Sequence, residues 1–377
     1  MGNLIKAAAA TALALGAFTS VSAVAQQMVK VGIVQSTSGG SAAIYGTVQK
    51  NAAELAIEQI NASGQLGNLK LEGMHADDAG DRGQTVNIFQ RMLNRDKVAV
   101  IFGPSLSNSM FAAGPLAQQA RTPVIASSNT ASGIPAIGTY IFRTSPPESV
   151  TFPGVLQFAK EKYKIKTAAQ IYGIDDVSMK ANYEVHKAAL QKEGIKVLTT
   201  ETLQKGDVDY SAQLTKIKAA NPDAIVISAL AEEVANIVRQ ARQLGIPQAT
   251  LLIASNSAIS PKFIELAGPA GEGLLAGAGW FLDFDSPANK AFIKAYSAKF
   301  GSEPDSYAAY QYTAVLAFAD ALKRAGGAGD SAKLRDALAA TKDIDSPLGK
   351  FSFTSDREPV IQAKVLVVKA AKFVIAE

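Results

Sequence analysis

The chain has 377 residues, contains no cysteine and carries a formal net charge of +4. The absence of cysteine excludes disulfides, thiolate metal sites, a catalytic thiol and a lipid-modified N-terminal cysteine. The small positive surplus is dispersed along the chain, which indicates a solvated surface and predicts no nucleic acid partner. The length exceeds what one core usually covers, so two domains are expected.

Residues 1–25 have the composition of a signal peptide. Lys6 supplies the positive charge, Ala7 to Phe18 form an apolar stretch, and Ala23 and Ala25 are the small residues of a cleavage site. The apolar stretch falls short of the roughly 20 residues that span a bilayer, so a retained anchor is the weaker interpretation. No later run is apolar enough to cross a membrane. We expect a cleaved signal peptide, release into the periplasm and no direct membrane insertion.

Downstream of the leader, short runs rich in β-branched residues alternate with segments of helical spacing. The predicted strands are Val29 to Val34, Leu69 to Met74, Val98 to Phe102, Pro123 to Ala126, Ala168 to Tyr172, Ile195 to Thr200, Ala224 to Ser228 and Leu251 to Ala254. Between the first two, Ala53, Ala56, Ile57 and Ile60 fall on one face of a helix that ends before Gly64. This alternation predicts an α/β protein with doubly wound parallel sheets.

Three breaks interrupt the alternation, and each suits a crossing between two lobes. They are Arg143 to Pro147, Gly268 to Gly279 and Ser346 to Gly349, the last of which precedes an expected terminal strand pair. Two helices, Pro287 to Phe300 and Tyr307 to Ala325, follow the second break. We therefore expect a first lobe formed by residues 26–145 plus 280–348 and a second lobe formed by residues 146–279 plus 349–377.

A candidate anion site follows the strand predicted before Gly103. The segment Gly103 to Ser109, which includes Ser107 and Asn108, leads into a helix, so backbone N–H groups and hydroxyls gather at a helix N-terminus. Ser127 to Thr130 follows the next strand at the same sheet edge, where open α/β sheets bind ligands. The pattern predicts a carboxylate clamp. The alternative is that Ser107 only caps the helix and residues 128–130 only form a turn.

The residue inventory argues against an enzyme. The two histidines, His75 and His186, lie among charged residues on a predicted strand and helix, where structural roles are usual. The sequence contains no G-x-S-x-G elbow, no H-E-x-x-H, no P-loop and no G-x-G-x-x-G after its first strand. We therefore expect no catalytic residue, no metal and no cofactor.

Several short motifs occur in a particular order: Val31 to Val34, Tyr45-Gly46, Ile60 to Gly64, Asp77-Asp78, Phe102 to Ser105, Pro123 to Ala126, Phe142 to Thr144 and Asp209 to Ser211. Together they resemble the branched-chain amino acid-binding proteins of ABC transporters over nearly the whole mature chain. The resemblance implies a type I periplasmic binding fold, whose two lobes, joined by three crossovers, close over a ligand. It also implies a permease pair with its ATPase as partner. A sensory domain of the same fold is the alternative.

The resemblance assigns ligand-binding roles to one half of the site. Tyr45 matches an aromatic residue that covers the ligand, and Ser107, Ser128 and Thr130 match the set that binds its carboxylate. Tyr307 matches a second aromatic wall, with ordinary core packing as the alternative.

The other half departs from the family pattern. Val177 and Ala231 stand where the family has tyrosines, and Asn256 stands where an acid binds the ammonium of the ligand. A buried ammonium without a carboxylate partner is costly, which predicts a ligand without an α-amino group. Trp280 and Phe281 are candidates to line an aromatic ring, with a hydrophobic plug at the hinge as the alternative for Trp280.

The sequence thus predicts a receptor for a small carboxylate, aromatic or branched and without an α-amino group. The alternative ligand is a branched-chain or aromatic L-amino acid. In that case Asp175, Asp176, Glu232 or Glu233 supplies the missing acid through a shift of one or two residues in register.

Overall fold

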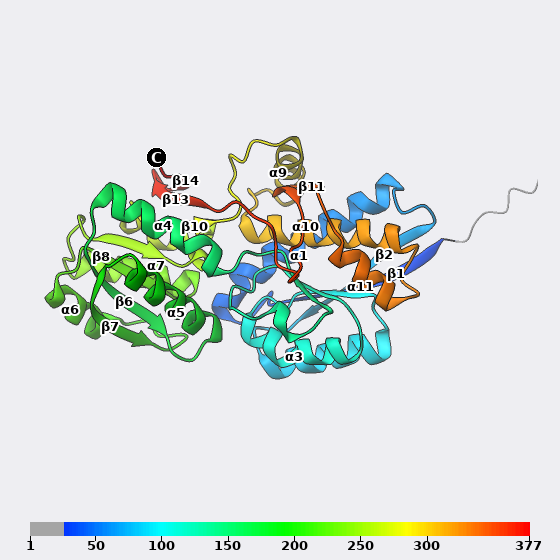
Figure 1. Ribbon diagram of the computed structural model, residues 1–377, viewed down its shortest axis with the longest axis horizontal. Coiled ribbons are helices and arrows are strands. Elements are labelled where there is room, and N and C mark those ends of the chain that lie inside the picture. Colours follow the sequence, from blue (N-terminus) through cyan, green and yellow to red (C-terminus); the bar gives the residue numbers. More distant parts are fainter. Residues whose placement is uncertain (1–25) are drawn as a thin grey trace, which may run out of the picture.

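The computed structural model describes residues 26–377 as two lobes joined side by side (Figure 1). The predicted signal peptide, residues 1–25, lies outside the described residues. Each lobe is a β-sheet packed between helices, so apolar clusters form on its two faces. None of the described helices is long and apolar enough to span a membrane.

Lobe 1 contains a parallel sheet of five strands in the order β2-β1-β3-β4-β5. Its strands are β1 (Gln27–Gln35), β2 (Leu69–Asp77), β3 (Val100–Phe102), β4 (Val124–Ala126) and β5 (Ile141–Arg143), with the small hairpin β11 (Ile344–Ser346) and β12 (Gly349–Phe351). Its helices are α1 (Ala43–Ser63), α2 (Arg82–Arg91), α3 (Ser107–Gln119), α9 (Pro287–Phe300), α10 (Ser306–Ala325) and α11 (Ser331–Ala339). Successive residues of β1 face opposite sides, with Ile33 toward α1 and α10 and Val34 toward α2 and α3.

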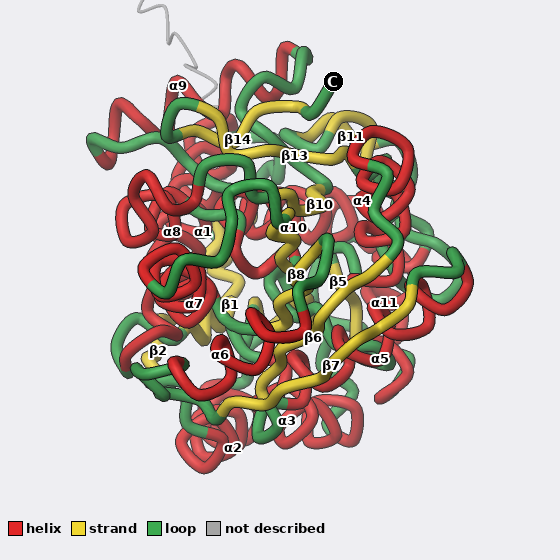
Figure 2. The backbone as a smooth tube through the Cα atoms, turned by 90° about the vertical axis from the view of Figure 1, so that its left-hand side faces the viewer, coloured by secondary structure: helices red, strands yellow, loops and turns green. Residues whose placement is uncertain are grey.

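Lobe 2 contains a sheet of seven strands in the order β14-β13-β10-β9-β8-β6-β7, seen from the lobe 2 side in Figure 2. Its strands are β6 (Thr167–Gly173), β7 (Lys196–Leu203), β8 (Ala224–Ser228), β9 (Leu251–Ala254), β10 (Leu275–Ala278), β13 (Lys364–Lys369) and β14 (Lys372–Ile375). Its helices are α4 (Glu148–Tyr163), α5 (Val177–Lys192), α6 (Ser211–Ala220), α7 (Ala231–Gln243) and α8 (Pro261–Ala267). β6 to β9 run parallel as predicted, β10 extends the parallel part of the sheet, and β13 and β14 add an antiparallel edge.

Three segments cross between the lobes: residues 144–147, residues 279–286 and residues 359–363. They converge at Gly279, where an added Cβ would lie 2.8 Å from Ile361 and 3.0 Å from Pro146. A side chain at residue 279 would push the other two segments away. Because residue 279 is a glycine, the three crossing segments pack against one another and form one hinge.

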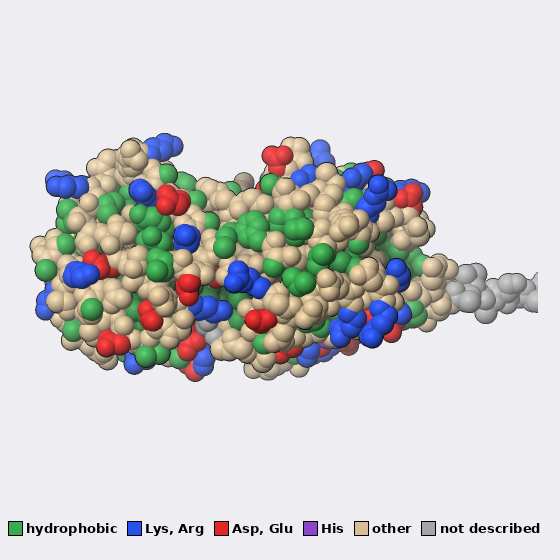
Figure 3. Space-filling model, turned by 90° about the horizontal axis from the view of Figure 1, so that it is seen from below, with side chains coloured by type: hydrophobic (Ala, Val, Ile, Leu, Met, Phe, Trp, Pro, Cys, Tyr) green, Lys and Arg blue, Asp and Glu red, His purple; other side chains and the backbone are tan. Residues whose placement is uncertain are grey.

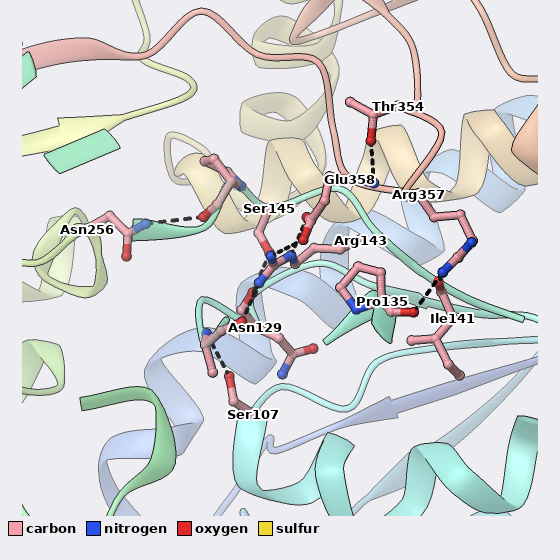
Figure 4. Close-up of polar contacts among 12 residues, drawn as sticks. Ser107, Asn129, Pro135, Ile141, Arg143, Ser145, Asn256, Thr354, Arg357 and Glu358 are labelled. Atoms are coloured by element: carbon pink, nitrogen blue, oxygen red, sulfur yellow. Dashed lines mark hydrogen bonds and ion pairs between the residues drawn. The ribbon is translucent and has the colours of Figure 1, made fainter. Parts of the chain in front are cut away.

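The third crossing lies later in the chain than the expected division at residue 348. Phe351 and Phe353 are buried in the lobe 1 core, where Phe353 packs against Phe142. Arg143, only 1% exposed, donates from Nε to Glu358 Oε2 at 2.8 Å (Figure 4). Residues 349–358 therefore pack on lobe 1, and only the segment after them joins lobe 2.

The eight strands predicted from β-branched runs all form, and the helix Pro287–Phe300 has its predicted ends. Four strands, β5, β10, β11 and β12, were not predicted, whereas β13 and β14 form the expected terminal pair. β5 has only three residues, and β10 reads Leu-Ala-Gly-Ala, which has low intrinsic strand propensity. Both are fully buried in their sheets, so tertiary pairing decides their conformation.

Candidate functional site

A narrow cavity, here called the main cavity, lies between the lobes. It is lined by Tyr45, Ser105, Leu106, Ser107, Ser128, Thr130, Ser178, Met179, Asn182, Ala229, Leu230, Ser257 and Tyr307. A smaller inner cavity adjoins it, because Thr130 and Tyr307 line both. No charged side chain of the described chain lines either cavity. Charges of both signs lie instead on the outside, where the two lobes touch (Figure 3).

Lobe 1 presents the N-terminus of α3 to the main cavity. Leu106 is the N-cap residue, and no side chain of residues 26–377 caps this helix start. Ser107 is the first helical residue, which excludes the alternative that it is the N-cap, and its Oγ accepts from Ala131 N at 3.4 Å. The preceding turn needs Gly103, whose φ is +116° and whose Cβ would lie 2.0 Å from Val34 O. Uncapped N–H groups beside hydroxyls favour an anion.

Buried glutamines hold the hydroxyls of the lobe 1 wall in place. Ser105 Oγ lies 2.7 Å from Gln35 Oε1 and 2.8 Å from Gln49 Oε1. Gln49 donates to Ser128 Oγ at 2.9 Å, and Ser128 Oγ in turn donates to Ser105 O at 2.6 Å. Gln35 also donates to Gln311 on α10 at 3.1 Å. This neutral network, here called the glutamine network, orients the wall without any ligand.

Two tyrosines of lobe 1 reach across to lobe 2. Tyr45 OH accepts from Ala231 N at 2.9 Å and donates to Ser257 O at 3.3 Å. Tyr307 OH donates to Asn256 O at 3.2 Å, and its ring meets that of Tyr45 edge-on at 4.9 Å. Burial raises the pKa of both phenols above the ordinary value, so both remain neutral. The tyrosines thus cover the main cavity and tie the lobes together.

A second interlobe contact joins α3 to α5, and we call it the α3–α5 latch. Asn108 Nδ2 donates to Asp176 Oδ2 at 3.0 Å, and Asn108 Oδ1 accepts from Val177 N at 2.9 Å. Asp176 also caps α5 by accepting from Ser178 N and Met179 N. The latch therefore fixes the start of α5 against lobe 1 when the lobes are together.

Lobe 2 supplies small, apolar and amide side chains to the site. Asn182 on α5 is 3% exposed, and its Oδ1 has no hydrogen-bond partner among the described residues. Asn256 lines the inner cavity and donates from Nδ2 to Pro146 O at 3.3 Å (Figure 4). The Asn256 Oδ1 atom is likewise buried without a partner in the described part of the chain. The lobe 2 wall thus offers two unsatisfied acceptors.

Acidic residues lie behind this wall rather than in it. Glu148 accepts from Asn256 N at 3.1 Å and contacts His186 Nε2 at 2.8 Å. Burial raises the pKa of Glu233 to about 7, although the backbone N–H groups of Leu230 and Gly206 donate to the carboxylate and lower this pKa.

The acids proposed for a shifted register do not line either cavity. Asp175 accepts from Lys205 N, Asp176 and Glu233 hold helix starts, and Glu232 is absent from both linings. The lining therefore does not support that alternative.

The structure brings together half of the predicted site. Tyr45, Ser107, Ser128, Thr130 and Tyr307 line the main cavity.

Three other predicted residues, Asn108, Val177 and Ala231, make interlobe contacts but line neither cavity. Val177 is 42% exposed, so its small size makes no room for a ligand ring.

Trp280 is the predicted site residue that the structure moves elsewhere. With Phe281 it lines a separate groove at the hinge, and its Nε1 donates to Asn289 Oδ1 at 2.7 Å. Trp280 also packs edge-on against Phe292. The alternative of a hydrophobic plug at the hinge fits this placement, because the backbone crossing at residue 280 turns the side chain away from the cleft.

Several lining and supporting residues were not predicted: Gln35, Gln49, Gln311, Ser105, Leu106, Ser178, Met179, Asn182, Ala229, Leu230 and Ser257. The glutamines carry a readable signal, because Gln49 interrupts the apolar face of a helix and Gln35 ends an apolar strand. Asn182 shares the buried face of α5 with His186, four residues later. A polar residue on a buried helix face is a signal, but its partner is not readable from sequence.

Within residues 26–377, no group of three or more His, Asp or Glu side chains is arranged to hold a metal ion.

The family described as periplasmic binding protein matches residues 28–372. A leucine-, isoleucine-, valine-, threonine- and alanine-binding protein of Pseudomonas aeruginosa is 31% identical over 91% of this chain and 90% of its own length. A branched-chain amino acid transporter substrate-binding protein of Streptococcus pneumoniae, solved with isoleucine, is 27% identical with a TM-score of 0.87, covering 93% and 99% of the two chains. A solute-binding protein of Rhodopseudomonas palustris, solved with 3,4-dihydroxybenzoic acid, is 25% identical with a TM-score of 0.82, covering 92% and 95%.

Proposed function

Because the chain belongs to the periplasmic binding proteins, as a substrate-binding protein of the branched-chain amino acid-binding family of ABC transporters, we propose that it closes its lobes over a small carboxylate. Proteins of this family bind solutes for an importer and are not enzymes. The observation that carries the proposal is the uncapped N-terminus of α3, which meets serine and threonine hydroxyls in a cavity lined by uncharged residues.

The carboxylate end of the ligand binds lobe 1. Ser107, Ser128 and Thr130 donate hydroxyl protons to it, together with the N–H groups of the first α3 turn. Lobe 1 captures the ligand first, because the glutamine network keeps these groups in position. Closure then adds lobe 2 and its tyrosine contacts, which shifts an existing equilibrium between open and closed forms.

Two ligand classes remain for the other end, and a different observation favours each. The names of the relatives favour a branched-chain amino acid, which was the alternative in the sequence analysis. The cavity lining favours an acid without an amine, aromatic or branched, because Asn256 replaces the family's acid and no carboxylate lines the site. The comparisons support the amino acid more strongly than the amine-free acid.

The closed form delivers the ligand to the permease pair of the importer. The two lobes have to be held together for a permease to recognise them as loaded, and the α3–α5 latch supplies such a contact at the cleft. The leader directs export and is then cleaved after Ala25, and the mature chain has no cysteine to carry a lipid. Mass spectrometry of the protein isolated from a periplasmic fraction tests the cleavage. The expected first residue is Gln26.

The ligand class is tested by calorimetry and thermal unfolding on protein that has been unfolded and refolded to remove carried-over ligand. Matched probes are L-leucine with 4-methylpentanoate, and L-phenylalanine with 3-phenylpropanoate, together with benzoate. A true ligand at a hundredfold excess over Kd stabilises the protein by about 2.7 kcal/mol. Tighter binding of the amino acids rejects the amine-free class, tighter binding of the deaminated acids rejects the amino acid class, and no binding at all rejects the carboxylate proposal.

A further inference from the structure

We propose that Asn182 is a specificity-determining residue, whose Oδ1 accepts a hydrogen bond from an amine or hydroxyl group on the bound carboxylate. The inference rests on the proposed function and deepens it, because it assigns a chemical group to the end of the ligand that faces lobe 2. Asn182 lies on α5, outside the set of positions that the family resemblance assigned.

The first step is that Asn182 has an unmet hydrogen bond inside the site. The side chain lines the main cavity, is 3% exposed, and buries Oδ1 with no partner among the described residues. A buried carbonyl that has lost water and gained no donor destabilises the closed form. A ligand that brings a donor to this atom removes that penalty, so the closed form selects such a ligand.

The second step is that the Asn182 turn is held rigidly. One turn further along α5, His186 is fully buried between Glu148 and Ser228, at 2.8 and 2.9 Å from its two ring nitrogens. Phe152 stacks on the His186 ring with centroids 3.8 Å apart. Asp176 caps the start of the same helix. A residue held on such a helix keeps its amide at one place in the site and discriminates between ligands.

The third step is the sign of the group that Asn182 selects. Of the charged side chains near this turn, the acids Asp176 and Glu148 are buried, whereas Lys180 and Glu184 are exposed on the outer face of α5. No Lys or Arg of the described chain lines either cavity. A second ligand anion would meet these carboxylates, whereas a donor, neutral or positive, is favoured there. The carboxylate of the ligand therefore faces α3 and its donor faces α5.

The test compares affinities for matched pairs of acids that differ in one donor. The pairs are 4-hydroxybenzoate with benzoate, and L-leucine with 4-methylpentanoate, measured by calorimetry on refolded protein. Wild type prefers the donor-bearing member of at least one pair. Asn182→Leu keeps the size of the side chain and lowers affinity for that member about tenfold, with the donor-free member changed less than about twofold. Asn87→Leu, the same substitution at an exposed site on α2, leaves both affinities unchanged.

Asn182→Asp supplies a second readout that keeps the shape of the side chain. It raises the preference for L-leucine over 4-methylpentanoate about tenfold, since a carboxylate attracts the ammonium and repels an uncompensated acid. If Asn182→Leu does not fold, as judged by circular dichroism, the change of preference in Asn182→Asp tests the inference in its place. Equal losses for both members of a pair in each folded variant overturn the inference alone. Absence of any binding to wild type overturns the proposed function as well.

Discussion

The two walls of the cleft are built in opposite ways. The lobe 1 wall holds its serine hydroxyls through the glutamine network, and behind it the buried Arg143 donates to Asn129 O and Ala131 O. The lobe 2 wall buries two amide oxygens that have no partner in the described part of the chain, and acids such as Glu148 and Glu233 lie behind it. Under the proposed function, this difference means that lobe 1 is preorganised for one constant group, the carboxylate, whereas lobe 2 depends on the ligand to complete its hydrogen bonds.

The largest effect is expected at Glu233, one of the acids behind the lobe 2 wall. Burial raises the pKa of Glu233 from 4.5 to about 7, so the folded protein binds this proton more tightly than the unfolded chain. The stabilising contribution is complete below pH 4.5 and is lost as the pH rises through about 7. The Glu233→Gln variant has no carboxyl group to titrate at this position, so it should not lose this stabilising contribution as the pH rises. Between pH 4.5 and 8, the free energy of unfolding of wild type should fall by about 3 kcal/mol relative to the variant, measured by urea titration. A difference that does not change with pH contradicts the assignment.

The next effect tests the constant end of the site in lobe 1. Ser107→Ala combined with Thr130→Ala removes two hydroxyls from the carboxylate clamp and should lower ligand affinity by one to two orders of magnitude, as measured by calorimetry. The reason is that hydrogen bonds to charged groups are worth roughly 1.5 to 3 kcal/mol. An unchanged affinity in the folded double variant removes the clamp from the mechanism.

A smaller loss should follow from disturbing the glutamine network. Gln49→Leu leaves Ser128 without its glutamine partner and Ser105 with Gln35 alone, and it should lower the free energy of unfolding by roughly 1 to 3 kcal/mol. Affinity should fall as well, because the clamp hydroxyls lose their orientation. Gln90→Leu, at an exposed site on α2, is the control and should change neither quantity. If the Gln49→Leu variant has the stability and affinity of wild type, water replaces the glutamine without a loss of free energy.

The smallest effect tests the α3–α5 latch, which touches both walls and lines neither cavity. Asn108→Ala removes two interlobe hydrogen bonds that exist only when the lobes are together, so it should weaken binding roughly fivefold through faster ligand release. Stopped-flow kinetics should show the change in the dissociation rate and little change in the association rate. A slower association with unchanged release assigns Asn108 to the open form instead.

The elements of the fold were readable because their signals are local. β-Branched runs such as Ala224–Ser228 pair wherever the sheet places them, and the strand-turn-helix around Gly103 brings N–H groups and hydroxyls together within a few residues. The terminal strand pair was also readable, but its antiparallel pairing with β10 and the buried strand β10 itself were not, because these partners lie far apart in sequence. The prediction that Trp280 lines the ligand site was wrong for a related reason. The direction of its side chain depends on how the crossing segment passes through the hinge.

The sequence by itself determined an α/β chain of two lobes and a set of hydroxyls at a helix start in the first of them, because strand propensity, helix starts and hydroxyl spacing act over a few neighbouring residues. Only the tertiary structure decided what faces those hydroxyls. Asn182 and Asn256 come from different elements of lobe 2, and the latch joins helices that are far apart in the chain. The packing of one lobe against the other determines which of these polar groups are paired, and that packing is not encoded in any local pattern.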